Sequence, residues 1–415
     1  MGTLGWKSAL LAALALSVGC GARTNDKVEP AAIAAAPITT ATPQAAAPQV
    51  LVPPPAAPVL PATEVTVLVA GDLLPHRPHL VPAERVVAGL EPLGDLFRAA
   101  DATVANFEAA TGDPAHAPRL TYVVGPEWLG AVKKSGVTAV TGANNHACDA
   151  GHVGLTETIK AASSADLPLV GVDDKDPWRP RVVAEKAGRR VCAVAWTTIV
   201  NSETSCNKDS RLARAGTNKA GYHKVKTSIA RAKKECDATI AILHGGEEYV
   251  PQLKGMTEMG KWAAESGADA VVIHHPHILS PMFVHATKDA RKVPVYASVG
   301  NLLSNQGESY KPPMFPVLRE NRRLVCVNGW TRLGMIARLA VRFEDGAKRP
   351  ALSFGYHLLW TDNEHADDKK VESPKIATRL LDPDKDAAVI ARLRDDERGP
   401  VAVFDDPAWI KPSAR

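Results

Sequence analysis

The sequence predicts an α/β fold, because short apolar runs alternate with segments of helical pattern from residue 63 onward. Near-continuous apolar, β-branched runs are typical of strands that are buried on both faces. We expect such strands at residues 65–70, 103–105, 137–140, 238–243, 270–273 and 293–298. Helices are expected between them, at residues 93–100, 126–135, 154–165, 225–235 and 256–266. This order predicts a parallel or mixed sheet that is flanked by helices.

The composition is that of an ordinary globular protein. Of the 415 residues, 45% are hydrophobic and 23% are charged, which excludes the disordered, collagen-like and coiled-coil classes. The 49 basic and 45 acidic residues give a formal net charge of +4 and form no long run of one sign. Since nucleic-acid-binding domains concentrate basic residues in a patch or stripe, we expect no nucleic-acid partner.

Residues 1–20 predict an export signal. Lys7 precedes an apolar run at residues 9–18, which is too short to cross a bilayer as a helix. The run ends in small residues before Cys20, a pattern that resembles the cleavage box of bacterial lipoproteins. We expect Cys20 to be acylated and to anchor the protein to a membrane; the alternative is a plain secretory signal in which Cys20 has no role. Both interpretations place the protein outside the cytoplasm, in the cell envelope, the periplasm or the medium.

Three regions follow the signal. Residues 21–62 form a Pro/Ala-rich linker, which we expect to be extended and to hold the folded part away from a membrane surface. Residues 63–362 are expected to form the folded domain, which ends in two strands around residues 344–347. Residues 363–415 are charged and are expected to form a tail with a helix near residues 386–396.

Five cysteines follow Cys20, at positions 148, 192, 206, 236 and 326. An odd number in an exported protein leaves at least one thiol free, unless one pairs between chains. Cys148 and Cys192 lie in apolar stretches and are expected to be buried thiols. A disulfide can form between two of Cys206, Cys236 and Cys326. Because the chain has no C-x-x-C pair, the spacing does not favour a zinc ribbon or a thioredoxin-like site.

Each predicted strand ends in residues suited to metal or phosphate chemistry. The strand ends are Gly71-Asp72, Asn106-Phe107-Glu108, Asn144-Asn145-His146, His244-Gly245-Gly246, His274-His275-Pro276-His277 and Gly300-Asn301. Because ligands gather beyond the carboxyl ends of parallel strands, we expect these side chains to lie close together. Carboxylates, Asn carbonyls and imidazoles suit one or two Mn, Fe or Zn ions. A pair of ions about 3.5–4 Å apart would hold the attacking and leaving oxygens of a phosphoester.

A structural interpretation competes with the metal site at several positions. Asp72 and Asn145 can instead cap the helices that follow them, and Asn301 is more typical of a turn. His275 and His277 are two residues apart, so on a regular strand they would point to the same side. The proline between them bends the backbone and can let both imidazoles face one cluster.

In this order the motifs resemble those of the CapA family, proteins of capsule and poly-γ-glutamate synthesis whose domain belongs to the calcineurin-like metallophosphoesterase fold. The matching pieces span residues 65–301 and are Gly71-Asp72 with Arg77, Asn106-x-Glu108, Asn144-Asn145-His146-x-x-Asp149-x-Gly151, His244-Gly245-Gly246-x-Glu248-Tyr249, His274-His275-Pro276-His277 and Tyr296-x-Ser298-x-Gly300-Asn301. The resemblance implies a sandwich of two mixed β-sheets flanked by helices.

The resemblance also implies a role for each matching residue. The metal-ligand candidates are Asp72, Glu108, Asn145, His244, His275 and His277. His146 would stabilise the transition state or protonate a leaving group, and Asp149 would orient His146. Arg77 would hold a phosphate or carboxylate oxygen of the substrate.

We therefore expect an exported protein of capsule or poly-γ-glutamate biosynthesis that hydrolyses or transfers phosphoester or acyl bonds with the help of a divalent metal. Its expected partners are an anionic envelope polymer or its precursor, the membrane through the lipid, and a membrane-bound polymer synthase. One alternative is a non-catalytic component that binds or assembles the polymer on the same fold. Another is a hydrolase that cleaves amide bonds in the polymer.

Overall fold

The computed structural model describes residues 62–118, 121–201, 205–250, 254–310, 325–345, 347, 349–368 and 370–395. The predicted export signal with Cys20, and almost all of the predicted linker, lie outside these residues. No helix in the described ranges is long and apolar enough to cross a membrane.

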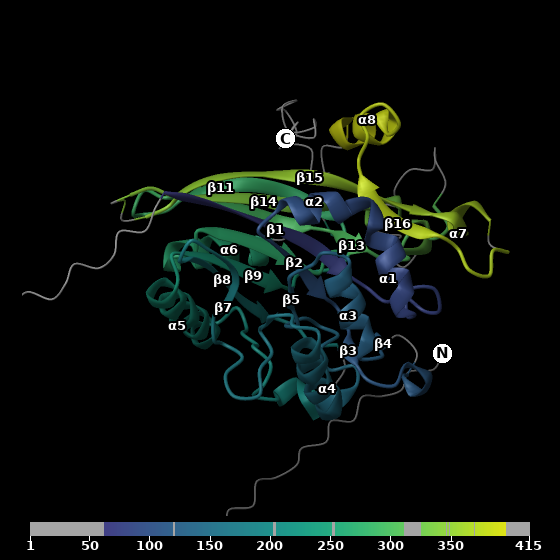
Figure 1. Ribbon diagram of the computed structural model, residues 1–415, viewed down its shortest axis with the longest axis horizontal. Helices are drawn as coiled ribbons and strands as arrows, with labels where there is room; N and C mark the ends of the chain where they lie inside the picture. The colour runs from purple at the N-terminus through teal and green to yellow at the C-terminus, as the bar shows by residue number, and fades with distance from the viewer. Residues whose placement is uncertain are drawn as a thin grey trace, which may run out of the picture. The chain divides into compact units, whose positions relative to one another are not determined.

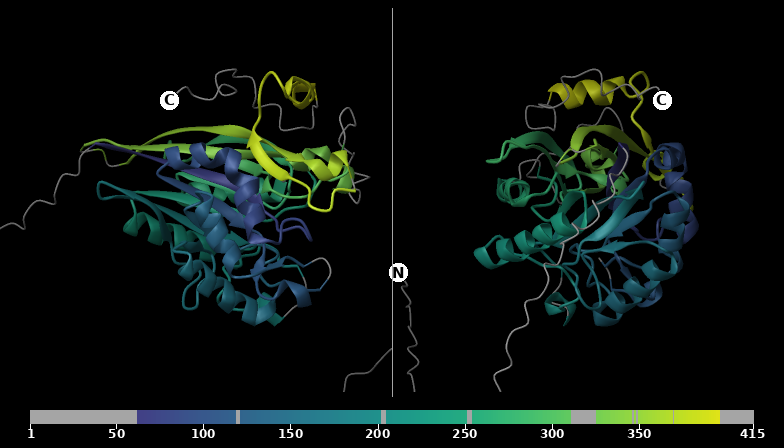
Figure 2. Two further views of the ribbon diagram at one scale, coloured as in Figure 1. Left: turned by 45° about the vertical axis from the view of Figure 1, so that its right-hand side comes forward. Right: turned by 60° about the vertical axis from the view of Figure 1, so that its left-hand side comes forward.

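Two mixed β-sheets flanked by helices form the fold, as expected (Figure 1; Figure 2). The first sheet has the order β16-β15-β14-β1-β2-β5-β6, and β13 also pairs with β1. Its strands are β1 (Thr63–Leu73), β2 (Ala102–Phe107), β5 (Ala139–Thr141), β6 (Leu169–Val170), β13 (Asn301–Leu303), β14 (Leu333–Phe343), β15 (Ala351–Asn363) and β16 (Ile376–Leu380). The second has the order β11-β12-β10-β9-β8-β7, with β7 (Arg181–Lys186), β8 (Arg189–Thr197), β9 (Ala238–His244), β10 (Ala270–His274), β11 (Leu279–Ala286) and β12 (Lys292–Val299). A small third sheet pairs β3 (Ala110–Thr111) with β4 (Val123–Val124).

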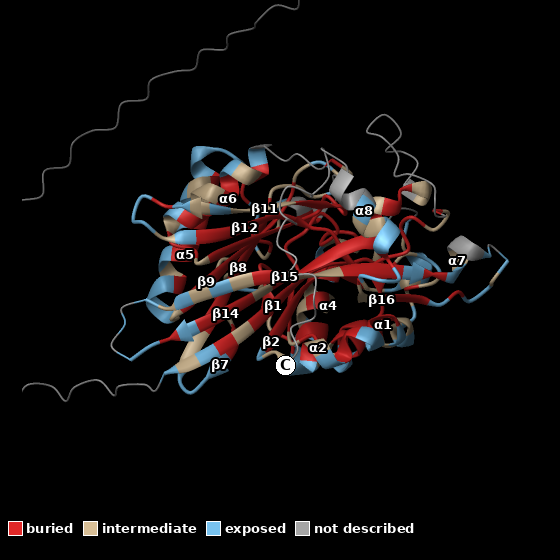
Figure 3. Cartoon of the chain, turned by 90° about the horizontal axis from the view of Figure 1, so that it is seen from above, coloured by how far each residue is buried: buried red, intermediate tan, exposed pale blue. Residues whose placement is uncertain are grey.

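The helices fall into two groups. The first contains α1 (Ala83–Leu90), α2 (Gly94–Ala99), α3 (Glu127–Lys134) and α4 (Gly151–Ser164), which follow strands of the first sheet or of the small third sheet. The second contains α5 (Lys219–Glu235) and α6 (Lys254–Ser266), which pack on the second sheet. Two short helices, α7 (Glu364–Asp367) and α8 (Ala387–Asp395), lie near the end of the described chain. Figure 3 shows that the strands are largely buried and that exposed residues lie mainly on helices and connections.

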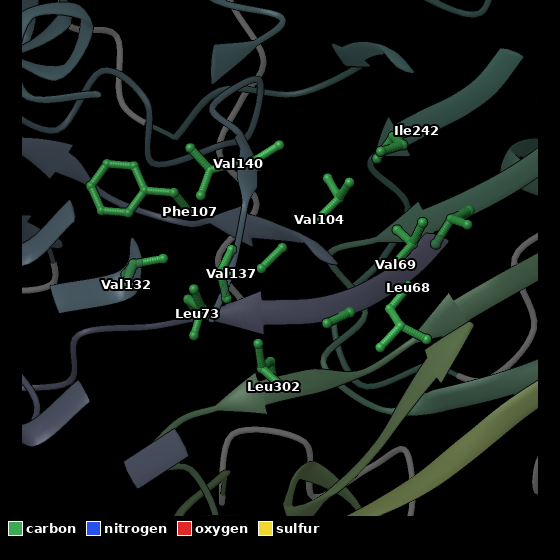
Figure 4. Close-up of a cluster of buried hydrophobic side chains, with 14 of the residues drawn as sticks. Leu68, Val69, Leu73, Val104, Phe107, Val132, Val137, Val140, Ile242 and Leu302 are labelled. Carbon is green, nitrogen blue, oxygen red and sulfur yellow. The ribbon is translucent and has the colours of Figure 1, made fainter. Parts of the chain in front are cut away.

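Strand β9 shows why these apolar runs lack a polar alternation. Ile240 and Ile242 face the large core to which both sheets contribute, whereas Ala241 and Leu243 face a second core that includes residues of α5 and α6. A strand between two cores has no solvated face, so both sets of alternating side chains are apolar. Figure 4 shows side chains of both sheets, Ile242 and Val69 among them, in one buried cluster.

Parallel pairing aligns the strand ends that carry polar side chains. In the first sheet β1 is parallel to β2 and β13, and Asp72 lies opposite Asn106 and Asn301. In the second sheet β9 is parallel to β8 and β10, and His244 lies opposite His274. The prediction that these carboxyl ends lie together is confirmed within each sheet.

The first sheet continues further along the chain than expected. β14 and β15 are the two strands predicted around residues 344–347, and α8 lies where a helix was expected. β16 comes from the predicted tail, yet it pairs with β15 at the edge of the sheet. The folded domain therefore extends beyond residue 362. Five residues of strand between charged segments are too few for their alternation to be recognised in the sequence.

The cysteine pairing corrects the expectation from the sequence. Cys148 and Cys192, expected to be buried thiols, form disulfides with Cys206 and Cys236 respectively. Cys326 is free and partly exposed. Apolar neighbours indicate burial of a cysteine, but they do not indicate which second cysteine the fold brings close across 58 or 44 residues.

We expect loss of the Cys148–Cys206 disulfide to destabilise the protein. The disulfide closes a loop of 58 residues, and the chain-entropy model assigns about 4 kcal/mol to a loop of that length. The variant Cys148→Ser/Cys206→Ser should lose about 2–4 kcal/mol of unfolding free energy in equilibrium urea unfolding. The variant Cys326→Ser is the control and should unfold as the wild type does. An unchanged urea midpoint for the double variant would contradict the prediction.

Candidate metal centre

The acidic part of the site lies at the ends of β1 and β2. Asp72, Asn106 and Glu108 are all fully buried. The Asn106 amide donates to Asp72 Oδ1 at 2.8 Å and to Glu108 Oε2 at 3.3 Å. Its carbonyl oxygen accepts from Thr141 Oγ1 at 3.0 Å, which fixes the orientation of the amide. Asn106 thus holds one oxygen of each carboxylate, and the other oxygens, Asp72 Oδ2 and Glu108 Oε1, face the histidines.

The histidines come from the ends of β9 and β10. His275 and His277 both have left-handed backbone conformations, with φ angles of 103° and 57°. Such conformations cost residues other than glycine about 1–3 kcal/mol and persist where the surroundings impose them. The ring centroids of His275 and His277 are 5.8 Å apart, and the His244 ring lies 5.0 Å from that of His275. The prediction that both imidazoles join one cluster is confirmed.

Glu108 Oε1 lies between these imidazoles. It is 3.5 Å from His277 Nε2 and 3.7 Å from His244 Nε2. Among the described residues it has no hydrogen-bond partner, and the same is true of the buried His275 Nδ1 and Asn145 Nδ2. Asn145 Oδ1 lies 2.8 Å from His244 Nε2. A buried carboxylate oxygen without a hydrogen bond is unfavourable unless another group compensates its charge.

These side chains fit a divalent metal ion. Three sets place one ligand atom from each member within 4.8 Å of one another: Glu108–His244–His275, Asp72–Glu108–His277 and Glu248–His275–His277. Carboxylate oxygens and imidazole nitrogens are suitable ligands for Mn, Fe and Zn. A cation here would compensate the charge of Glu108 and give its free oxygen a partner. Glu108, His275 and His277 each belong to two of the three sets, so the cluster could hold one ion or two.

Burial and neighbouring charge shift the pKa values of this cluster in different directions. Burial, with the nearby charge of Asp72, raises the pKa of Glu108 well above 4.5. Burial also acts to raise the pKa of Asp72, but the hydrogen bond with His277 and the surrounding imidazoles lower it overall. Burial lowers the pKa of His244, and it lowers that of His275 to about 3. Both rings are therefore neutral at pH 7, the state in which an imidazole binds a metal.

His277 is the exception among these rings. Burial acts to lower its pKa, but the hydrogen bond and charge of Asp72 raise it above 6.5 overall. Its Nδ1 lies 3.2 Å from Asp72 Oδ2 and 3.1 Å from Asn301 Oδ1. The Asp72–His277 pair therefore carries opposite charges in the absence of a metal.

His146 and Asp149 form a second buried pair beside the cluster. His146 Nδ1 donates to Asp149 Oδ2 at 2.6 Å, and the same oxygen accepts the backbone N–H of Tyr122 at 2.6 Å. The Tyr122 ring packs on the imidazole, with centroids 4.3 Å apart. Because an ionised carboxylate only accepts hydrogen bonds, the proton lies on Nδ1 and Nε2 carries the lone pair. His146 Nε2 accepts from the Asn201 amide at 3.2 Å.

The structure brings together all six residues that the sequence predicts as metal ligands: Asp72, Glu108, Asn145, His244, His275 and His277. The predicted pair of His146 and Asp149 is also present. Arg77 lies apart from the cluster. It is exposed, and its guanidinium donates to the carbonyl oxygen of Ala117 at 3.0 Å.

Several residues near the site were not assigned a role from the sequence. Asn301, expected to be a turn residue, is buried, and its amide donates to the carbonyl of Thr331 at 2.8 Å while its oxygen faces His277. Glu248, which appears in the sequence only as part of a matching motif, belongs to a set with His275 and His277. Asn301 directly follows a predicted strand, as Asp72 does, and this position could have identified it as a site residue.

Other neighbours of the site gave no such signal. Tyr122 and Asn201 follow no predicted strand, and only the fold brings them to His146. His76 lies between Tyr122 Oη at 2.9 Å and the backbone N–H of Asn305 at 3.2 Å. These contacts join segments more than 40 residues apart in the chain.

Replacing Glu108 by Gln should stabilise the metal-free protein, increasingly so at higher pH. The folded-state pKa of Glu108 is raised above 4.5, so its ionisation destabilises the fold as pH rises through and above that value. Gln keeps the size of the side chain and an oxygen for Asn106, but it carries no charge. Urea unfolding in EDTA between about pH 5 and pH 8 should show a stability difference that widens with pH. The exposed Glu64→Gln is the control; a Glu108→Gln variant less stable than wild type at every pH would contradict the prediction.

Comparison with known proteins agrees with this geometry. Residues 66–306 match the family described as "Bacterial capsule synthesis protein PGA_cap". The chain is 28% identical over 183 residues to the capsule biosynthesis protein CapA of Bacillus anthracis, and this alignment covers 44% of this chain and 43% of the relative. It is 24% identical over 232 residues to the PGA biosynthesis protein CapA of Bacillus subtilis (strain 168), and this alignment covers 54% of this chain and 58% of that relative.

The alignments span about half the length of these curated relatives. The family match, in contrast, covers more than half of this chain and includes every residue of the metal-ligand cluster. The chain therefore belongs to the bacterial capsule synthesis protein family PGA_cap.

Proposed function

We propose that this protein is an exported metal-dependent hydrolase or transferase that acts on phosphoester or acyl bonds during the synthesis of an anionic capsule polymer such as poly-γ-glutamate. One observation carries the metal dependence: the fully buried Glu108 Oε1 has no hydrogen bond among the described residues and faces two imidazoles. Family membership supports the capsule pathway. The relatives' names, capsule biosynthesis protein and PGA biosynthesis protein, support the polymer.

The metal would be held by Glu108 with His244, His275 and His277, with Asp72 and Asn145 beside them. A divalent ion of Mn, Fe or Zn would supply Lewis-acid polarisation of the substrate and acidify water at neutral pH. One ion or two would fit this ligand set, since Glu108 is shared between two of its groups.

His146 would be the general acid–base group that transfers a proton during the reaction. Asp149 holds the Nδ1 proton of His146 and stabilises the charge of the imidazolium, so Nε2 is the atom that accepts a proton and returns it to a leaving group. Tyr122 fixes the ring plane by stacking and by its N–H bond to Asp149. Asn201 donates to Nε2 and would have to yield that atom to a substrate.

Export is supported by two features of the chain. Residues 1–20 have the pattern of an export signal that ends at Cys20, where acylation would anchor the protein to a membrane in the cell envelope. The disulfides Cys148–Cys206 and Cys192–Cys236 are typical of an oxidising compartment. A membrane-bound polymer synthase would be its neighbour there.

His146→Ala should lower turnover of a chromogenic phosphodiester or of a γ-glutamyl anilide by about 10²–10⁴-fold, because general acid–base catalysis contributes that much. Metal content should stay at the wild-type level, since none of the metal-ligand sets found among the described residues includes His146. Asp149→Asn should lower turnover as well and change its pH profile, because Asn no longer fixes the Nδ1 proton.

His152 offers a matched control. It also pairs with an aspartate, Asp209, but it lies on α4 with about half of its side chain exposed. His152→Ala should keep wild-type turnover. Full activity in His146→Ala would contradict the proposed role. A wild type that binds metal but turns over neither substrate would favour a non-catalytic polymer-binding component.

A further inference from the structure

Helix α5 concentrates the positive charge of the protein. Its 17 residues include six Lys or Arg and one Glu, a formal charge of +5. The whole chain has a formal charge of +4, so the rest of the sequence is close to neutral. The basic residues are interleaved with small and apolar ones, which is why no run of charge is visible in the sequence.

The charge lies on one face because the opposite face is packed. Asn218 caps the helix by accepting the Gly221 N–H at 2.9 Å. Val225, Ile229 and Ala232 are buried in the core beneath the helix. The helical repeat then turns four of the five exposed lysines toward one side, over about 22 Å of helix; they are Lys219, Lys226, Lys233 and Lys234, and the fifth, Lys224, lies over the Trp178 ring.

Among the described residues Lys219, Lys226 and Lys234 have no carboxylate partner, and Lys233 forms no salt bridge, although it acts to lower the pKa of the nearby Asp269. Arg231 of the same helix, in contrast, pairs with Asp176 and Glu235. Some lysines elsewhere are paired as well, such as Lys186 with Asp101. Unpaired like charges on one helix face repel one another. A row of them is therefore a surface that an anionic ligand stabilises.

The surface around the C-terminal half of α5 is hollowed. One cavity of about 400 Å³ includes Lys226 and Lys234 in its lining. Another, of about 300 Å³, has a mixed lining in which Lys233 lies with Arg291 and Arg349 and with the acidic residues Asp237, Asp269 and Glu344. A third, of about 370 Å³, includes Arg179, Arg181 and Arg190. Glu235 lines the first and third cavities, so these two adjoin.

We propose that the basic face of α5 and these adjoining cavities bind a linear polycarboxylate chain; this identifies the polymer-binding surface of the function proposed above and rests on it. Lysine provides mobile single-point contacts, which suit a flexible row of carboxylates. A bilayer surface is disfavoured, because the exposed apolar residues of α5 are only Ala220 and Ala230 and neither inserts into lipid.

The topology links this surface to the metal centre. α5 connects the carboxyl end of β8 to the start of the parallel strand β9, so its first turn lies at the end of the sheet where His244 lies. A polymer along α5 therefore runs from the far end of the sheet toward the candidate centre.

The test uses the full chain and fluorescently labelled poly-γ-glutamate, with binding measured by fluorescence anisotropy at low and at high salt. The variant Lys226→Glu/Lys234→Glu should weaken binding by about ten-fold or more and reduce its salt dependence. Lys134→Glu/Lys375→Glu changes the net charge equally at exposed positions on other elements and should bind as the wild type does.

Metal content and turnover of a small chromogenic substrate are measured on the same samples. The α5 variant should keep both, so a failed metal centre and a failed polymer surface give different results. Equal weakening by both charge variants, absence of polymer binding by the wild type, or binding only to anionic lipid vesicles would each overturn the proposal.

Discussion

The burial of negative charge at Glu108 is the constraint on which the site depends. A carboxylate with one unbonded oxygen is unfavourable inside a protein, and this one lies next to a second buried carboxylate, Asp72. The Asn106 amide compensates part of the charge, and the Asp72–His277 pair compensates another part. What is left is an oxygen between imidazoles, and a divalent cation would match both its charge and the ligand types around it.

The surrounding scaffold stabilises this arrangement of buried polar side chains. Parallel strands with apolar side chains on both faces hold the polar strand ends in register, and the packing of two cores supports the strained turn at His275 and His277. The disulfide between Cys148 and Cys206 joins the His146 loop to the segment that follows Asn201. Helix α5 is also held by apolar packing: its apolar side contacts the core, and the lysines on its opposite side face solvent, where a ligand can bind.

The fold class and the clustering of the candidate ligands were predictable because both follow from local patterns. Apolar runs mark the strands, and the polar residue directly after each run, such as Asp72 or His244, marks the edge at which they meet. Roles that depend on tertiary contact were not predictable. Tyr122 contacts His146 only in the folded chain, and nothing near Cys148 in the sequence indicates that it pairs with Cys206. Asn301 has the sequence context of a turn residue, and only the structure shows its hydrogen bond with His277.

The most direct test of the account is the metal content of the purified full chain after reconstitution with Mn, Fe or Zn. We predict one or two equivalents in the wild type, lost in His244→Ala/His277→Ala while the circular dichroism spectrum stays unchanged. Absence of stoichiometric metal in the wild type, or equal metal in the variant, would contradict the account. The buried charge of Glu108 would then need another explanation.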